Sequence, residues 1–208
     1  MELTDAVRRR RMVRSYDPDR AVPDAVLHHL IDLATRAPSA GFSQGWDFLI
    51  LREGALARFW ASTTEPERPP DRWLRGMRTA PVVVLCLSDP DRYLDRYAEP
   101  DKGWTARDEA GWPVPYWDVD TGMAALLLLL GAVDEGLGGC LFGVPPGRHE
   151  AVRAAFGIPD GRRLVGAVSL GHAAPDRRSP SLRRGRRPRA EVAHDGRFGT
   201  PFDVGGGG

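Results

Sequence analysis

Apolar positions along the chain follow two spacings, and each spacing predicts one kind of element. Over residues 24–34 they recur every three or four positions, as on one face of an amphipathic helix. Residues 80–88, APVVVLCLS, form instead a continuous run rich in β-branched side chains, which predicts a strand buried on both faces. Similar patterns predict strands over residues 46–51, 140–144 and 162–172, and helices over residues 4–13, 55–62 and 148–156.

One further helix is expected to begin at Asp118 or Asp120, and its body is apolar on nearly every side. That body reads TGMAALLLLLGAVDEGLG. A helix of this kind must be buried all round, either in a large core or across a subunit interface. Its longest apolar run, residues 123–133, is far shorter than the roughly 20 residues that span a bilayer. We therefore expect no membrane span and a cytoplasmic protein.

Residues 89–117 are the least regular part of the chain, rich in Asp, Pro, Tyr and Trp. A connection of this length inside a compact domain is usually functional, so we interpret it as an active-site flap. The chain shows no internal repeats. The sequence predicts one domain of mixed α and β character over residues 1–189, followed by a C-terminal arm and flexible tail over residues 190–208.

Composition excludes some classes of function but does not identify one. The 208 residues carry a formal net charge of +1, so the molecule as a whole is not built to seek nucleic acid or an anionic membrane. The two cysteines, Cys86 and Cys140, are isolated in apolar runs and predict neither a disulfide framework nor a zinc site. No nucleophile–base pair can be named from the sequence. If the protein is an enzyme, we expect a cofactor to carry the chemistry.

Arginine is concentrated in two clusters. Residues 8–11 are four consecutive arginines followed by Arg14, and on a helix Arg10 and Arg14 share one face. The second cluster, SPSLRRGRRPR, would place Arg184 and Arg186 on the same side of an extended chain. A solvated basic face, a nucleic-acid surface and a bidentate anion site are all consistent with this spacing.

Two stretches resemble the opening motifs of a known family. RRRMVRSYDPDRAVP and RAPSAGFSQGWDFLIL resemble the motifs R-R-S-x-R-x-F and A-P-S-x-x-N-x-Q-P-W-x-F of the nitroreductase family, which are FMN-dependent NAD(P)H oxidoreductases. DEGLGGCLFGVP, AVSLGH and the arginine-rich close follow in that family's order, so the resemblance spans Arg8 to about Arg189. It implies an α+β fold with a mixed, mostly antiparallel sheet flanked by helices. It also implies an interlocked homodimer with two FMN sites at the interface.

The resemblance implies roles for particular residues by their position. The opening arginines would contact the flavin phosphate, ribityl chain or ring edge, and the C-terminal pair would clamp the phosphate. Ser39 and Gln44 would reach FMN from the partner subunit, while the backbone of residues 141–143 would lie along the flavin near its N5. The implied cofactor-binding set is Arg10, Arg11, Met12, Arg14, Ser39, Ala40, Phe42, Gln44, Leu141, Phe142, Gly143, Arg184 and Arg186.

Four positions depart from the family's pattern. Met12 replaces the usual Ser, Phe42 the usual Asn and Gly45 the usual Pro, and Phe142 stands where many members have an acidic residue. These changes predict a more apolar flavin site. The loop GFSQ is also similar to that of the flavin-fragmenting branch that makes the lower ligand of cobamides. That branch carries an acidic residue where this chain has Met12, so we rank this alternative lower.

The implied reaction is ping-pong hydride transfer from NADH or NADPH, through FMN, to a small aromatic or apolar acceptor. The pocket walls would come from Phe42 of one subunit and the flap aromatics, which suit a flat substrate. Two other readings stay open. One is a protein that sequesters flavin or deazaflavin without turnover, and the other is a biosynthetic FMN dehydrogenase or oxidase that does not use nicotinamide. None of these readings involves a nucleic-acid or membrane partner.

Overall fold

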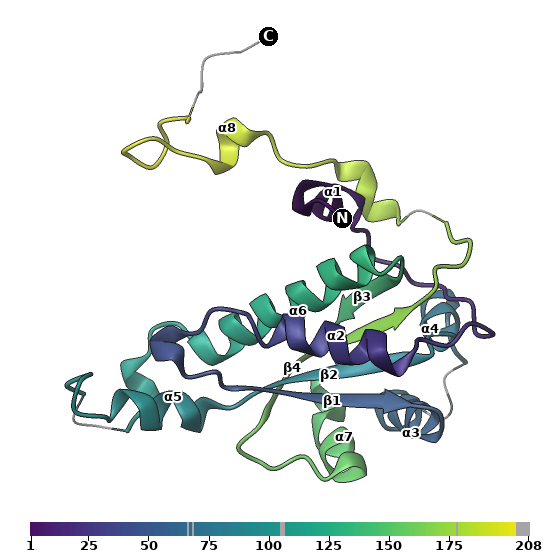
Figure 1. Ribbon diagram of the computed structural model, residues 1–208, viewed down its shortest axis with the longest axis horizontal. Coiled ribbons are helices and arrows are strands. Elements are labelled where there is room, and N and C mark those ends of the chain that lie inside the picture. The colour runs from purple at the N-terminus through teal and green to yellow at the C-terminus, as the bar shows by residue number, and fades with distance from the viewer. Residues whose placement is uncertain (66, 68, 105–106, 178, 203–208) are drawn as a thin grey trace. The chain divides into compact units, whose positions relative to one another are not determined.

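A computed structural model of the chain describes residues 1–65, 67, 69–104, 107–177 and 179–202. The chain divides into two units, residues 1–176 and residues 177–208. In the first unit, a four-stranded sheet lies between helices on both of its faces (Figure 1). The predicted α+β fold is confirmed.

The sheet has the strand order β1-β2-β4-β3, and all three neighbouring pairs are antiparallel. The register places Trp46 opposite Ser88 and Val82 opposite Leu170. Among the described residues, one parallel bridge joins Met12 to Gly139, so the predicted mostly antiparallel arrangement is confirmed. The strands are β1 (Trp46–Arg52), β2 (Val82–Ser88), β3 (Gly138–Phe142) and β4 (Arg163–Gly171).

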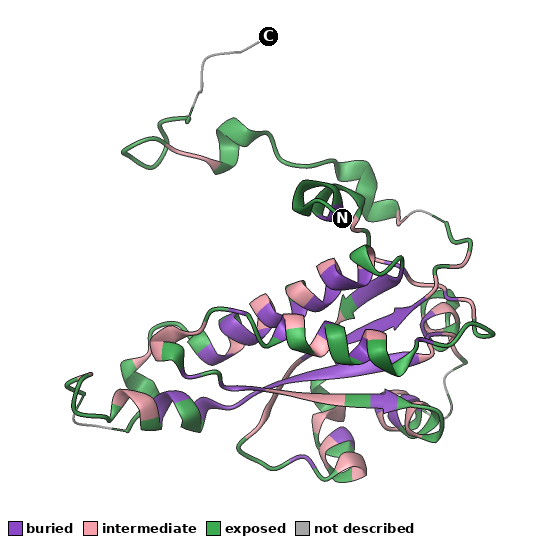
Figure 2. Ribbon diagram, viewed as in Figure 1, coloured by how far each residue is buried: buried purple, intermediate pink, exposed green. Residues whose placement is uncertain are grey.

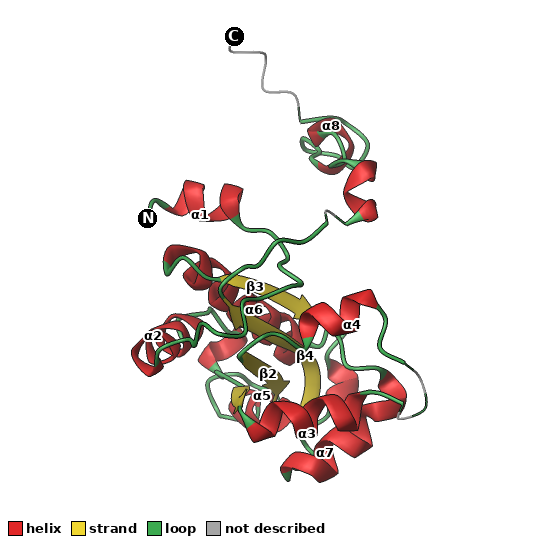
Figure 3. Cartoon of the chain, turned by 90° about the vertical axis from the view of Figure 1, so that its right-hand side faces the viewer, coloured by secondary structure: helices red, strands yellow, loops and turns green. Residues whose placement is uncertain are grey.

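Helices cover the sheet in two layers. The helix α6 packs on α2 and on the sheet, while α3 packs on α7. Figure 3 shows α2 on one side of the strands and α3 and α7 on the other. The helices of this unit are α1 (Leu3–Arg9), α2 (Asp24–Ala34), α3 (Gly54–Thr63), α4 (Arg72–Met77), α5 (Pro90–Tyr97), α6 (Tyr116–Asp134) and α7 (His149–Phe156).

The strand β2 explains why two helical layers are needed. All seven of its residues are buried, as its continuous apolar run predicts (Figure 2). Val82 and Val84 belong to the core cluster shared with α2 and α6, whereas Val83 and Leu85 belong to the cluster shared with α3 and α7. Successive side chains of a strand point to opposite faces, so each layer receives half of this strand.

The first helix, the segment 89–117 and the apolar helix α6 differ from the sequence prediction. The first helix ends at Arg9 rather than near Val13, because the chain beyond it pairs with β3. The segment 89–117 is not irregular throughout, since it contains α5 and a 3-10 turn (Glu109–Gly111). The apolar helix α6 begins directly after Pro115, before the two predicted aspartates.

The short helix α4 has no counterpart among the predicted elements. Asp71 caps it, because its carboxylate accepts a hydrogen bond from the Leu74 amide at 2.8 Å. Its six residues are too few to show a helical repeat of apolar positions. The helix matters for function because it carries two side chains into the candidate site described below.

The helix α6 is only partly buried within one chain. Ala124, Ala125 and Leu128 are fully buried against the core, but Val119 and Leu126 are 43% and 47% exposed. By length and apolarity α6 could also cross a membrane, although half of its apolar window is buried inside the protein. Burial on every side is therefore wrong for a single chain, and the subunit interface stays a prediction.

The second unit is short and exposed. Among its described residues none is buried, and the regular elements are a 3-10 turn (Pro180–Arg184) and α8 (Arg189–Val192). It begins at residue 177, so it includes residues 177–189 as well as the predicted arm. The predicted domain boundary at residue 189 remains a prediction.

Candidate functional site

The opening arginine segment is fixed between β3 and α4. The amide of Val13 donates to the Gly139 carbonyl at 3.0 Å, which joins the segment to the edge of the sheet. On its other side, the Arg14 carbonyl oxygen lies 2.1 Å from where a Cβ on Gly76 would be. Only a glycine allows α4 to approach the segment this closely. The backbone of residues 12–14 is therefore held by two elements.

Tyr16 anchors the end of the same segment. Its hydroxyl donates to the Val13 carbonyl at 2.7 Å and lies 2.6 Å from the Ser169 hydroxyl on β4. Burial raises the pKa of Tyr16, so the hydroxyl remains protonated over the physiological range and can act as a donor. This buried contact ties the arginine segment to the middle of the sheet.

The arginines on this segment lack carboxylate partners. Within the described ranges, Arg10, Arg11 and Arg14 form no ion pair, whereas ten arginines elsewhere do. The Nη1 atom of Arg10 is buried and has no hydrogen-bond partner there. A buried guanidinium nitrogen without a partner is costly, and a bound anion would satisfy it. The segment is therefore a candidate anion site.

A cavity of about 410 Å³ lies at the end of β3. Trp60 stacks on Phe142 with ring centroids 5.8 Å apart and planes 12° apart, and Trp73 meets Phe142 edge-on at 5.7 Å. The indole Nε1 of Trp60 is buried and has no hydrogen-bond partner. The lining residues are Trp60, Thr63, Thr64, Glu65, Pro69, Asp71, Trp73, Leu74, Phe142, Gly143, Val144, Pro145 and Arg148.

The cavity and the arginine segment share two elements. Leu74 lines the cavity from α4, the helix whose Gly76 touches Arg14. Phe142 ends β3, the strand whose Gly139 pairs with Met12. The structure thus brings the predicted arginine segment and the predicted residues 141–143 into one region. Phe142 and Gly143 line the cavity, whereas Leu141 does not line it and is 37% exposed.

The remaining predicted residues of the first unit lie away from the cavity. Ser39, Ala40, Phe42 and Gln44 belong to a turn that packs on α5. Figure 1 shows α5 at the end of the sheet opposite α3 and α4. One chain therefore does not bring this turn to its own cavity.

The turn at residues 41–45 reads G-x-S-x-G, a pattern found at serine nucleophiles of hydrolases. In those enzymes the serine lies between a strand and a following helix, but here the turn precedes the strand β1. Ser43 is 9% exposed, and its hydroxyl donates to the Ala40 carbonyl at 2.7 Å. The serine has a structural role in closing the turn.

The second unit carries the last two predicted residues, Arg184 and Arg186. Arg184 ends the 3-10 turn and both side chains are exposed. The expected phosphate clamp that joins them to the opening arginines stays a prediction.

Sequence reasoning missed the aromatic walls contributed by α3 and α4. Trp60 and Trp73 are far from Phe142 in the chain, and nothing in their local spacing indicates that they meet it. A usable signal existed in the composition, because two of the six tryptophans fall in a short stretch without other candidate function. Among the described residues, no cluster of three or more His, Cys, Asp or Glu side chains could hold a metal ion.

Solved structures define the class of fold. A nitroreductase family protein from Clostridium difficile 630 is 20% identical, with a TM-score of 0.69 over 95% of this chain and 100% of that chain. A protein from Desulfovibrio desulfuricans, solved in complex with FMN, is 21% identical, with a TM-score of 0.64 over 90% and 98% of the two chains. The fold is that of the nitroreductases.

Sequence comparison then gives the family. The nitroreductase family model matches residues 7–172. The NADH dehydrogenase of Thermus thermophilus is 27% identical over 195 residues, which cover 85% of this chain and 89% of that protein. A protein of Methanothermobacter thermautotrophicus, whose name gives NADH dehydrogenase and NAD(P)H nitroreductase, is 27% identical over 179 residues, covering 84% and 78%. The chain belongs to the nitroreductase family and is an oxidoreductase.

Proposed function

We propose that the protein is an FMN-dependent oxidoreductase that takes electrons from NADH or NADPH and passes them to a small, flat or apolar acceptor. The observation that carries this proposal is the unpaired arginine segment beside an aromatic cavity, with α4 and β3 contributing to both. An anion site joined to an aromatic slot suits a cofactor with a phosphate at one end and a flat ring at the other. The FMN complex of the Desulfovibrio protein supports the choice of cofactor.

The residues present fit FMN at both of its ends. The orphaned Nη1 of Arg10 offers a donor to a phosphate, with Arg11 and Arg14 on the same segment. The residues at the end of β3 and the free Trp60 Nε1 offer an aromatic slot with a hydrogen-bond donor for the ring. When bound, FMN would supply the redox chemistry that no side chain here supplies.

The active form in this proposal is a homodimer. The turn with Ser39, Phe42 and Gln44 lies away from the cavity of its own chain, so a second copy is needed to bring such a turn to it. The exposed apolar side of α6, with Val119 and Leu126, offers a surface for that copy. The flap aromatics do not line the cavity at β3, so their expected role as walls of a substrate pocket stays a prediction.

Anaerobic rapid mixing of the FMN-loaded protein with NADH and with NADPH tests the proposal. We expect the flavin absorbance to bleach with at least one of the two nucleotides. If FMN stays oxidised with both, the nicotinamide half-reaction is wrong. Tight flavin retention without reduction would then favour the sequestering protein over the enzyme, and reduction by another substrate would favour the biosynthetic dehydrogenase.

Substitution of Arg10 tests the phosphate contact separately. Loss of a charge-assisted hydrogen bond costs about 1.5–3 kcal/mol, so Arg10→Gln should raise the FMN dissociation constant by roughly 10- to 100-fold. Arg9→Gln is the matched control, because Arg9 is adjacent in sequence and exposed on α1. Fluorescence titration measures both variants, and equal affinities would place the phosphate elsewhere.

A further inference from the structure

The turn before β1 has an unusual backbone. Gly41, Phe42 and Gln44 all have positive φ, at 62°, 57° and 51°. A side chain with a Cβ rarely adopts this left-handed conformation, because it crowds the neighbouring carbonyl. Two non-glycine residues in this region within one short turn therefore store strain, and surrounding contacts must hold them there.

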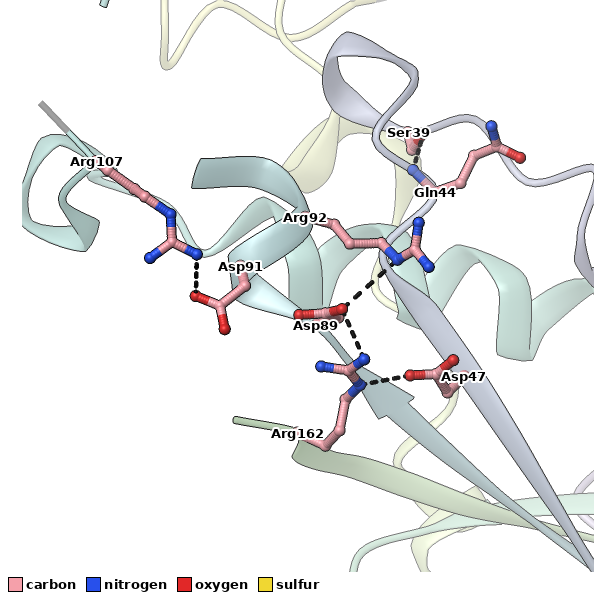
Figure 4. Close-up of polar contacts among 8 residues, drawn as sticks. All are labelled: Ser39, Gln44, Asp47, Asp89, Asp91, Arg92, Arg107 and Arg162. Carbon is pink, nitrogen blue, oxygen red and sulfur yellow. Dashed lines mark hydrogen bonds and ion pairs between the residues drawn. The ribbon is translucent and has the colours of Figure 1, made fainter. Parts of the chain in front are cut away.

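The strained turn displays two side chains instead of burying them. Phe42 is 77% exposed, and Gln44 is exposed beside it. Inside the turn, the Ser39 hydroxyl oxygen accepts a hydrogen bond from the backbone amide of Gln44 at 3.0 Å. The Gln44 side chain points outward (Figure 4). An exposed phenyl ring gains nothing from folding, so the strain serves neither burial nor a hidden contact.

A buried carboxylate on α6 holds one side of the turn. Asp120 is 2% exposed, and its Oδ2 accepts both the Ala40 amide and the Tyr93 hydroxyl, each at 2.8 Å. Burial, followed by the bond to Asp120, raises the pKa of Tyr93, so its hydroxyl stays protonated and donates. Asp120 thus joins the turn to α5 and α6 at one atom.

An arginine on α5 holds the other side of the turn. The Nε of Arg96 donates to the Gly41 carbonyl at 3.0 Å. Its two terminal nitrogens bind the carboxylate of Asp101 at 2.7 and 2.8 Å, and Nη1 also reaches Glu99 at 3.0 Å. The two carboxylates therefore fix the orientation of the Arg96 guanidinium, and its Nε is the donor that faces the turn.

Aromatic side chains of the flap, residues 89–117, also pack against the turn. A Cβ on Gly45 would lie 2.4 Å from the Tyr93 ring, and one on Gly41 would lie 2.8 Å from the Tyr97 ring. Both tyrosines pack on Trp112, with ring centroids 6.1 and 4.6 Å away. The aromatic side chains of the flap thus pack closely against the backbone of the turn.

Ion pairs at the N-terminal end of α5 secure the next stretch of chain. The amide of Asp89 donates to the Gly45 carbonyl at 3.0 Å. The buried Asp89 carboxylate binds Arg162 at 2.9 Å and approaches Arg92 at 3.5 Å, and Arg162 also binds Asp47 on β1 at 2.6 Å (Figure 4). The turn is held at Ala40, Gly41 and Gly45 by groups outside it.

We propose that Arg96 and Asp120 are positioning residues that hold the strained turn so that Phe42 and Gln44 meet a flat heteroaromatic ring in the site of a second copy. The inference rests on the proposed function for its ligand and its partner. Gln44 offers an amide donor and acceptor side by side, which suits the polar edge of such a ring, and Phe42 offers a face for stacking.

Arg96→Gln is the first test, with Arg107→Gln as its matched control. Both arginines bind two carboxylates, but those of Arg107 are Asp91 and Asp95, and among the described residues its hydrogen bonds and ion pairs do not reach the turn. Figure 4 shows the pair of Arg107 with Asp91. We expect hydrogen exchange of the amides of residues 40–45 to become at least tenfold faster in Arg96→Gln and to stay unchanged in Arg107→Gln. Equal exchange in the two variants would overturn the clamp, whatever the ligand.

The same two variants distinguish an effect on ligand binding from an effect on folding stability. In the FMN-loaded protein we expect Arg96→Gln to raise the FMN dissociation constant or the KM for the acceptor by about tenfold, with kcat less affected and the melting temperature equal to that of Arg107→Gln. If the wild type binds FMN but both variants match it, the positioning role is wrong. If the wild type binds no FMN, the proposed function fails and with it the ligand of this turn.

Strain relief gives a second test that a merely structural role would not pass. Phe42→Gly should raise the melting temperature by about 1–4 °C, because glycine accepts positive φ and little packing is lost, yet it should weaken FMN or acceptor binding. Glu53→Gly is the control, since Glu53 has a φ of 50° and lies at the start of α3. It should gain stability without losing affinity. An affinity of Phe42→Gly equal to that of the wild type would contradict the inference.

Discussion

Gly76 decides how closely α4 approaches the arginine segment. Its missing Cβ leaves room for the Arg14 carbonyl, and Trp73 and Leu74, which precede it on α4, line the cavity. A single glycine therefore couples the position of the anion site to the wall of the aromatic slot.

Gly76→Ala should destabilise the protein despite the better helix propensity of alanine. The new Cβ would lie 2.1 Å from a backbone oxygen, so α4 or the segment must move. Overpacking of this kind costs about 1–3 kcal/mol, against roughly 1 kcal/mol gained in propensity. We expect a lower melting temperature in calorimetry and a weaker FMN complex.

Gly54→Ala provides the comparison for that substitution. Gly54 begins α3, and a Cβ there would meet nothing within 4 Å. This variant should be as stable as the wild type or more stable by up to about 1 kcal/mol. If Gly76→Ala also gains stability, the close approach of α4 to Arg14 is not a constraint on the fold.

The elements show what a sequence pattern can and cannot predict. The strand β2 was predicted because burial on both faces makes every position apolar, and the opening motifs were found because their residues are adjacent in the chain. The helix α4 was not predicted, because six residues are too few to show an apolar repeat. The walls of the cavity were not predicted either, because Trp60, Trp73 and Phe142 come together only in the folded chain. The active-site flap predicted over residues 89–117 stays a prediction, and within one chain its aromatics pack on one another and against the turn before β1.

The apolar helix α6 carries the prediction that tests the homodimer. In solution we expect the protein to sediment at twice the 22.8 kDa of one chain. Leu126→Arg should place a charge in the interface and raise the dimer dissociation constant by roughly 100-fold or more, because an unpaired buried charge costs about 3–5 kcal/mol.

Ala151→Arg is the control for the dimer experiment. Ala151 is exposed on α7, which packs on α3 on the opposite side of the sheet from α6. Sedimentation of this variant should match the wild type. A wild-type protein that is monomeric at all concentrations would remove the partner from the account, and the turn before β1 would then need another ligand.

At the scale of the first unit, α3 and α4, which line the cavity, lie at the end of the sheet opposite α5, on which the turn packs (Figure 1). In the proposed homodimer, each chain would contribute one half of each of two sites. The proposed anion-binding half would use the opening arginines and the aromatic cavity, and the other half would use the strained turn held by α5 and α6. In that proposed site, Met12, Phe42 and Phe142 would give a more apolar lining than the family's motifs imply.

The measurement that tests this account most directly is an absorbance spectrum of the purified protein, repeated on the supernatant after heat release, with mass identification of the released cofactor. We expect the peaks of an oxidised flavin and about one FMN released per chain, since the cofactor must carry the redox chemistry. A colourless protein that also fails to take up added FMN would contradict the account, because neither the arginine segment nor the cavity would then have its proposed ligand.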